Sequence, residues 1–137
     1  MDIFIDSSII IEVFKENKEA LQIIELIKDR SNIIPHINPI VVSEVSYFLL
    51  KRTKISVQEI KDLLSGYNLL DTNKEIINND FNYIEKYQLY PNDAFILATC
   101  KYYGIKNLLS LDVDFIKCCL QEKINLINSP NLPSLSQ

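Results

Sequence analysis

Five acidic side chains stand at positions where carboxylates could bind divalent metal ions: Asp6, Glu44, Asp93, Asp112 and Asp114. Asp6 follows a short apolar run with β-branched residues, and the last two acids follow a second apolar run. In an open parallel α/β sheet ligands bind at the carboxyl ends of strands, so we expect these acids to meet at one edge. Neighbouring carboxylates repel unless cations lie between them, and oxygen ligands suit Mg²⁺ or Mn²⁺. Two such ions about 3.5–4 Å apart could support an in-line phosphoryl displacement.

Glu44 is the acid that local structure explains least well. It is the only acidic residue from Ser31 to Leu50, a stretch that contains no lysine or arginine. It also lies more than one turn inside a helix that is expected to begin at Pro39, beyond the strongest effect of the helix dipole. A lone carboxylate among apolar residues must be solvated, paired or metal-bound, because burying it bare is costly.

The other four acids each have a structural alternative when taken alone. Asp6 or Ser7 could cap the following helix, and Asp93 could be an acid favoured by a helix N-terminus. Asp112 and Asp114 could belong to a turn that precedes a helix. Their joint occurrence at strand ends and helix starts favours the functional interpretation.

Composition limits the class of protein. The 137 residues predict a single domain over 1–128, with a frayed tail over 129–137. Two glycines leave no glycine-rich phosphate loop, and a net charge of -4 argues against a general nucleic-acid binder but not against a metal-dependent nuclease. Three cysteines, two of them adjacent, predict free thiols, and no segment predicts a signal peptide or membrane span, so a cytoplasmic protein is expected.

Short apolar segments alternate with amphipathic ones along the chain. Strands are predicted at residues 2–5, 32–34, 69–70, 107–111 and 124–127, with Pro35 breaking the second. Helices are predicted at residues 9–14, 18–30, 40–52, 57–64, 74–87, 93–103 and 114–120. This alternation is typical of an α/β protein with parallel strands, and right-handed crossovers, found in about 98% of such connections, bring successive strand ends to one edge.

Four segments in this order resemble the PIN domain family: residues 3–8, Glu44 in the third long helix, residues 92–98 and residues 109–115. The chain is most similar to the small single-domain type found in VapC-type toxins, and the resemblance covers essentially its whole length. It implies a three-layer α/β/α fold with a five-stranded parallel sheet.

The same resemblance implies a metal-dependent endoribonuclease that hydrolyses RNA phosphodiester bonds with two Mg²⁺ or Mn²⁺ ions. The implied catalytic residues and metal ligands are Asp6, Glu44, Asp93 and Asp112, with Asp114 as a further metal ligand. Ser7 and Ser110 match positions from which the family orients ligands or water. A homodimer is implied, as is a cognate antitoxin that holds a toxin inactive.

Lys51, Arg52 and Lys54 are weaker candidates for contacts with RNA phosphates, because cations are favoured at any helix C-terminus. His36 lies between two prolines with no partner evident from the sequence, and no catalytic role is assigned to it. Two alternatives to the nuclease are a non-catalytic PIN-like scaffold that binds RNA or protein, and a phosphotransferase with an acidic cluster. Ser8 argues against a haloacid-type enzyme, which would have a second aspartate at that position.

Overall fold

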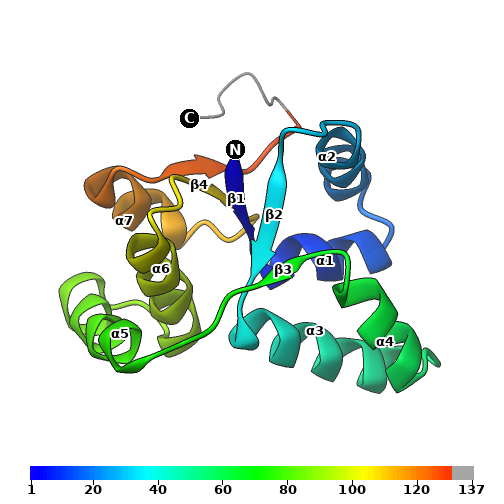
Figure 1. Ribbon diagram of the computed structural model, residues 1–137, viewed down its shortest axis with the longest axis horizontal. Coiled ribbons are helices and arrows are strands. Elements are labelled where there is room, and N and C mark those ends of the chain that lie inside the picture. The colour runs from blue at the N-terminus through cyan, green and yellow to red at the C-terminus, as the bar shows by residue number, and fades with distance from the viewer. Residues whose placement is uncertain (131–137) are drawn as a thin grey trace.

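Five parallel strands form one sheet in the computed structural model, which describes residues 1–130 (Figure 1). Their order across the sheet is β3-β2-β1-β4-β5, with β1 at the centre. The strands are β1 (Asp2–Ile5), β2 (Ile34–Ile37), β3 (Asn68–Leu69), β4 (Asn107–Leu109) and β5 (Asn125–Ile127). The predicted α/β fold with a five-stranded parallel sheet is confirmed.

Helices connect the strands and flank the sheet. They are α1 (Ser7–Phe14), α2 (Lys18–Lys28), α3 (Pro39–Arg52), α4 (Val57–Leu64), α5 (Lys74–Tyr87), α6 (Pro91–Tyr103) and α7 (Phe115–Glu122). In Figure 1, α5, α6 and α7 gather on the left of the central strands, and α1, α2 and α4 on the right. Among the described residues, no helix is both long and apolar enough to span a membrane.

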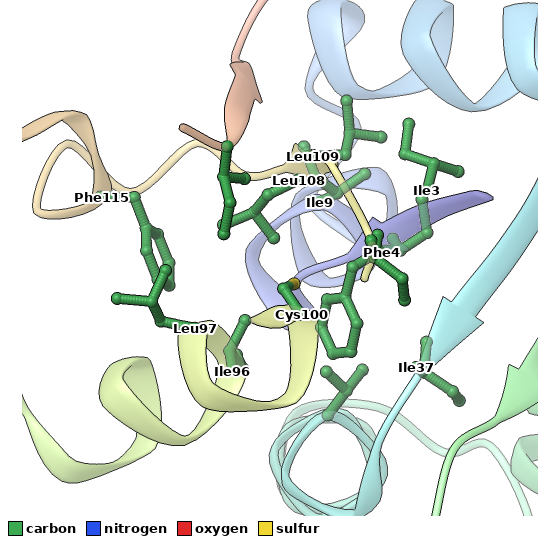
Figure 2. Close-up of a cluster of buried hydrophobic side chains, with 14 of the residues drawn as sticks. Ile3, Phe4, Ile9, Ile37, Ile96, Leu97, Cys100, Leu108, Leu109 and Phe115 are labelled. Carbon is green, nitrogen blue, oxygen red and sulfur yellow. The ribbon is translucent and has the colours of Figure 1, made fainter. Parts of the chain in front are cut away.

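The core lies around β1 and β4. Every residue from Ile3 to Ile5 is buried, as are Leu108 and Leu109 of β4. Figure 2 shows that Phe4 of β1 and Cys100 of α6 meet in this cluster, close to the side chains of neighbouring elements. Strands buried on both faces read as continuous apolar runs, which is why these two were visible in the sequence.

The position of β2 differs from the prediction, because Pro35 lies inside the strand instead of ending it. The N–H of Ile34 donates to the carbonyl of Met1, just before β1, whereas the carbonyl of Ile37 accepts from Leu70 N on the β3 side. The nitrogen of Pro35 therefore faces the side of β2 on which β3 lies. The strand β3 pairs with β2 from His36 onward. No ladder hydrogen bond is lost, because β3 has not begun at that level.

Other boundaries shift by a few residues. The strand β4 ends at Leu109, so Ser110 and Asp112 lie on the loop that follows it rather than at the strand end. The helix α1 begins at Ser7, directly after Asp6. The predicted frayed tail falls mostly on residues 131–137, which lie outside the described residues.

Helix starts and ends follow the predicted chemistry. The Asn38 side chain accepts a hydrogen bond from Val41 N, and Pro39 is the first residue of α3. Gly104 ends α6 with φ 66°, a left-handed conformation that a side chain would strain. Both predictions are confirmed, and both helices carry acids of the predicted site.

His36 has partners that the sequence did not reveal. It is buried on β2, with Nε2 2.7 Å from the Asp2 carboxylate and Nδ1 2.8 Å from the Asn68 side-chain nitrogen. Because the Asn68 side-chain nitrogen can only donate, Nδ1 accepts and Nε2–H donates to Asp2. The ring thus connects β1, β2 and β3 on one face of the sheet.

Replacing this ring tests its structural role. We expect His36→Ala to lower the free energy of unfolding by about 2–4 kcal/mol, because a buried ring and two hydrogen bonds are lost. Urea denaturation followed by circular dichroism would measure the free energy of unfolding. Asp2→Asn keeps an acceptor for the ring and should leave that free energy nearly unchanged. Mn²⁺ binding per folded molecule should be unchanged in both variants, and its loss in His36→Ala would contradict a purely structural role.

Candidate metal centre

Asp6 lies at the carboxyl end of the central strand and is only 4% exposed. Its backbone N–H donates to Leu109 O at 2.9 Å, which places the ends of β1 and β4 side by side. Its backbone is extended and it occupies the N-cap position of α1, yet its side chain forms no cap hydrogen bond with that helix. The structure therefore does not support the alternative that Asp6 serves as a helix cap.

Two serines connect Asp6 to the loop after β4. Ser8 Oγ donates to Asp6 Oδ2 at 2.8 Å, and Ser110 Oγ donates to the same oxygen at 2.7 Å. Each hydroxyl also accepts a backbone N–H of the loop: Leu111 N at 3.1 Å for Ser8, and Asp112 N at 3.0 Å for Ser110. The loop that carries Asp112 is thereby fixed relative to Asp6.

Glu44 reaches the same edge from α3 and is half-buried. Ser7 Oγ, at the start of α1, donates to Glu44 Oε1 at 3.0 Å, and Asn92 of α6 forms a second side-chain hydrogen bond with it. Burial raises the pKa of Glu44, and the nearby Asp6 and Asp112 carboxylates add to the rise. Its environment is that of a carboxylate held in place by neutral donors.

Three further carboxylates complete the cluster. One oxygen each of Asp93, Asp112 and Asp114 lie within 4.8 Å of one another, a spacing that one cation could bridge. Asp112 Oδ1 also accepts the backbone N–H of Asp114 at 2.9 Å, which orients the turn before α7. All five predicted acids are thus brought to one edge of the sheet, as the topology suggested.

The electrostatics of the cluster are unfavourable without a cation. Burial, together with repulsion from Asp112 and Asp6, raises the pKa of Asp93 to about 7. Burial likewise raises the pKa of Asp6, against the lowering effect of the Ser110 and Ser8 hydrogen bonds. Within residues 1–130 no lysine, arginine or histidine forms an ion pair with any of the five acids. The donor set is entirely oxygen and negatively charged, and it fits hard divalent cations.

Two polar residues at the site were not singled out as functional from the sequence. Both lie within the segments that resemble the PIN domain family, residues 3–8 and 92–98, but neither was assigned a role there. Their hydrogen bonds to Asp6 and Glu44 depend on how three helices meet at the sheet edge. The one available signal was their position next to a predicted acid, at 6–8 and at 92–93.

The predicted basic residues divide into two groups. Lys51 and Arg52, at the end of α3, line a groove that Glu44 also lines. Lys54 is exposed in the segment after α3 and lies outside that lining. Only the first two are placed beside the acidic cluster.

Comparison with known proteins gives a consistent result. Residues 3–120 match the PIN domain family. Ribonuclease VapC2 of Methanocaldococcus jannaschii is 34% identical over 140 residues, covering 90% of this chain and 93% of the relative. Ribonuclease VapC6 of the same organism is 32% identical, covering 85% and 92% respectively.

Solved structures share the fold at lower identity. A toxin-antitoxin complex from Klebsiella pneumoniae contains a chain with a TM-score of 0.71 and 22% identity, covering 98% of this chain and 96% of that one. The sarcin-ricin loop cleaving toxin VapC20 of Mycobacterium tuberculosis has a TM-score of 0.68 and 14% identity, covering 85% and 94%.

The raised pKa values predict how stability depends on pH. A carboxyl group with a higher pKa in the folded state binds its proton more tightly there, so its contribution is complete at low pH and is lost as pH rises toward the folded value. We therefore expect the melting temperature of the chelator-treated protein to fall between about pH 4 and about pH 7, from the usual pKa of an aspartate to the raised pKa of Asp93 of about 7. Differential scanning fluorimetry would show it, and saturating Mn²⁺ should flatten the profile. A metal-free profile that rises over this range would contradict the assignment.

Removing one charge from the cluster should stabilise the metal-free protein. We expect Asp93→Asn to raise its melting temperature by a few degrees near pH 8, because repulsion with Asp112 and Asp6 is relieved. Mn²⁺ should then stabilise the variant less than the wild type, since one ligand is gone. Asp71→Asn, at an exposed aspartate after β3, is the matched control and should change neither value. If Asp93→Asn and Asp71→Asn have the same melting temperature and the same stabilisation by Mn²⁺, repulsion within the cluster does not destabilise the metal-free protein.

Proposed function

Because this chain belongs to the PIN domain family, we propose that it is a metal-dependent endoribonuclease that hydrolyses RNA phosphodiester bonds. The relatives named ribonucleases cover nearly its whole length, which supports the same activity here. The observation that carries the proposal is the convergence of five carboxylates on one sheet edge, with no ion pair from a cationic side chain within residues 1–130.

The proposed catalytic residues are Asp6, Glu44, Asp93 and Asp112, which with Asp114 would hold two Mg²⁺ or Mn²⁺ ions. The ions would supply Lewis-acid chemistry, activating a water and stabilising the negative charge of the phosphodiester during displacement. The carboxylates would hold the ions, and Ser7, Ser8 and Ser110 orient the carboxylates through hydrogen bonds. Asp93 has the further task of releasing its proton when a cation binds, because its pKa of about 7 leaves it partly protonated at neutral pH.

Ser110, His36 and the three cysteines are poorly placed to act as nucleophiles. Ser110 is fully buried and its hydroxyl lies between Asp6 and the Asp112 N–H. His36 is bound within the sheet, and the three cysteines are buried. These placements favour hydrolysis by water over a covalent enzyme intermediate.

We further propose that the protein is the toxin of a toxin–antitoxin pair and that it forms a homodimer. The VapC names of the relatives and the toxin–antitoxin complexes of the same fold support the first part. An apolar strip at and along α7 supports the second, since Val113, Ile116 and Leu120 are all exposed. Such a strip offers a face for a second copy.

Cleavage of labelled single-stranded RNA tests the function. We expect cutting by the wild type with Mn²⁺ or Mg²⁺ and none with EDTA. Asp6→Asn should reduce the rate by at least about 100-fold, and Ser110→Ala by about 10–100-fold, the usual cost of losing a group that supports a metal ligand.

Asp71→Asn is the matched control and should cut like the wild type. If Asp6→Asn also cuts like the wild type, the activity does not belong to this site. If the wild type binds Mn²⁺ and RNA but cleaves no RNA, the protein is a non-catalytic PIN-like scaffold and the proposed enzyme activity is wrong.

A further inference from the structure

A groove beside the acidic cluster is not used by the proposed chemistry. It has a volume of about 500 Å³ and lies between α1 and α3. Its lining residues are Ile11, Lys15, Glu44, Tyr47, Phe48, Lys51 and Arg52. Because Glu44 also belongs to the proposed metal centre, the groove opens directly onto it.

The lining residues that α3 contributes form one row along the groove. Glu44, Tyr47 and Lys51 stand at positions i, i+3 and i+7 and so lie on one face of the helix. About 10 Å along the helix axis separates the first from the last. A cation at that distance would contact a phosphate other than the one undergoing hydrolysis.

The far end of the groove is basic in an otherwise acidic protein. Lys15, at the C-terminus of α1, and Lys51 and Arg52, at the C-terminus of α3, converge there. Lys15 pairs with Glu12 at 3.5 Å, but within residues 1–130 neither of the other two forms an ion pair. The helix dipole favours a cation at the C-terminus of any helix. Here two helices end at the same groove, so their cations together form a site for anionic groups.

Aromatic rings lie among these cations. Tyr47 is 65% exposed, and Lys51 Nζ lies 5.2 Å from its ring centre while donating to its hydroxyl at 2.9 Å. Lys15 Nζ lies 5.6 Å from the ring centre of Phe48. A positive groove with an exposed ring is the arrangement by which proteins bind single-stranded nucleic acid, with phosphates on the cations and bases on the ring.

We propose that this groove binds the single-stranded RNA segment adjacent to the scissile phosphate, with a base stacked on Tyr47 and phosphates on Lys51 and Arg52. The inference rests on the proposed ribonuclease function and adds where the substrate strand lies. An acidic protein segment would satisfy the cations, but it would leave the exposed ring without a stacking partner. Lys54, outside the lining, has no part in the binding.

RNA binding tests the cationic part of the groove. The probe is a fluorescein-labelled single-stranded RNA of mixed sequence, measured by fluorescence anisotropy in Mg²⁺ with Asp6→Asn present in every protein to prevent cleavage. Lys51→Gln/Arg52→Gln should weaken binding and lower the slope of log affinity against log salt by about 1.4, since each phosphate contact on a single strand contributes about 0.7. Lys28→Gln/Arg30→Gln, on and just after α2, removes the same charge outside the groove and should leave both values unchanged.

The ring is tested separately. Tyr47→Leu should weaken binding about tenfold or more, whereas Tyr47→Phe keeps the stacking surface and should stay within about threefold. Poly-glutamate is the competitor that distinguishes an acidic protein segment from RNA. If it binds as tightly as the RNA and Tyr47→Leu has no effect, the occupant is an acidic protein and the RNA assignment is overturned.

Cleavage by the same variants with Asp6 restored separates this inference from the proposed function. The groove variants should raise KM while changing kcat by less than about threefold, because they remove binding remote from the reacting phosphate. If Lys51→Gln/Arg52→Gln and Tyr47→Leu both bind RNA and cleave it with the KM of the wild type, the groove does not bind the substrate. The proposed ribonuclease function is unaffected by that result. If the groove variants weaken RNA binding but the wild type cleaves no RNA, the ribonuclease function is wrong and RNA binding in the groove is retained.

Discussion

The hydrogen bonds from two serines to one oxygen of Asp6 are the interaction on which the site depends. The bond from Ser110 spans 104 residues of sequence and connects the central strand to the loop that carries Asp112. The fold places the ends of β1 and β4 side by side, but backbone pairing stops at Leu109. Beyond that point the hydroxyls of Ser8 and Ser110 set the distance between the acids.

Neutral donors are the suitable partners for such a cluster. A lysine or arginine beside Asp6 would relieve the repulsion and stabilise the protein by itself, but it would compete with any metal ion for the same oxygens. Hydroxyl and amide groups orient Asp6 and Glu44 while leaving their negative charge in place. The high pKa of Asp93 has burial as its main cause, and repulsion from Asp112 and Asp6 adds to it, because no cationic side chain within residues 1–130 pairs with these acids. Stability of the metal-free protein and readiness to bind cations therefore oppose each other.

The sequence was informative wherever the determining interaction was local or followed from topology. Apolar runs identified β1 and β4, and the rule that parallel strands end at one edge was enough to bring Asp6 and Asp112 together. It was uninformative where the determining interaction was remote. Pro35 is tolerated in β2 only because β3 starts one residue later, and the partners of His36 come from two other strands. In the same way, adjacent Ser7 and Ser8 look equivalent in sequence, yet they turn toward different carboxylates.

The all-oxygen character of the cluster also bears on which ion it takes. In the part of the chain that the structure describes, no histidine or cysteine belongs to the cluster, and the carboxylates come from four separate segments rather than from one rigid loop. Such ligands distinguish poorly among hard divalent cations, because discrimination comes from ligand softness and from enforced geometry. Occupancy is then governed by abundance: the ion most available in the surroundings fills the site, and a shift in that supply changes the metal without any change in the protein.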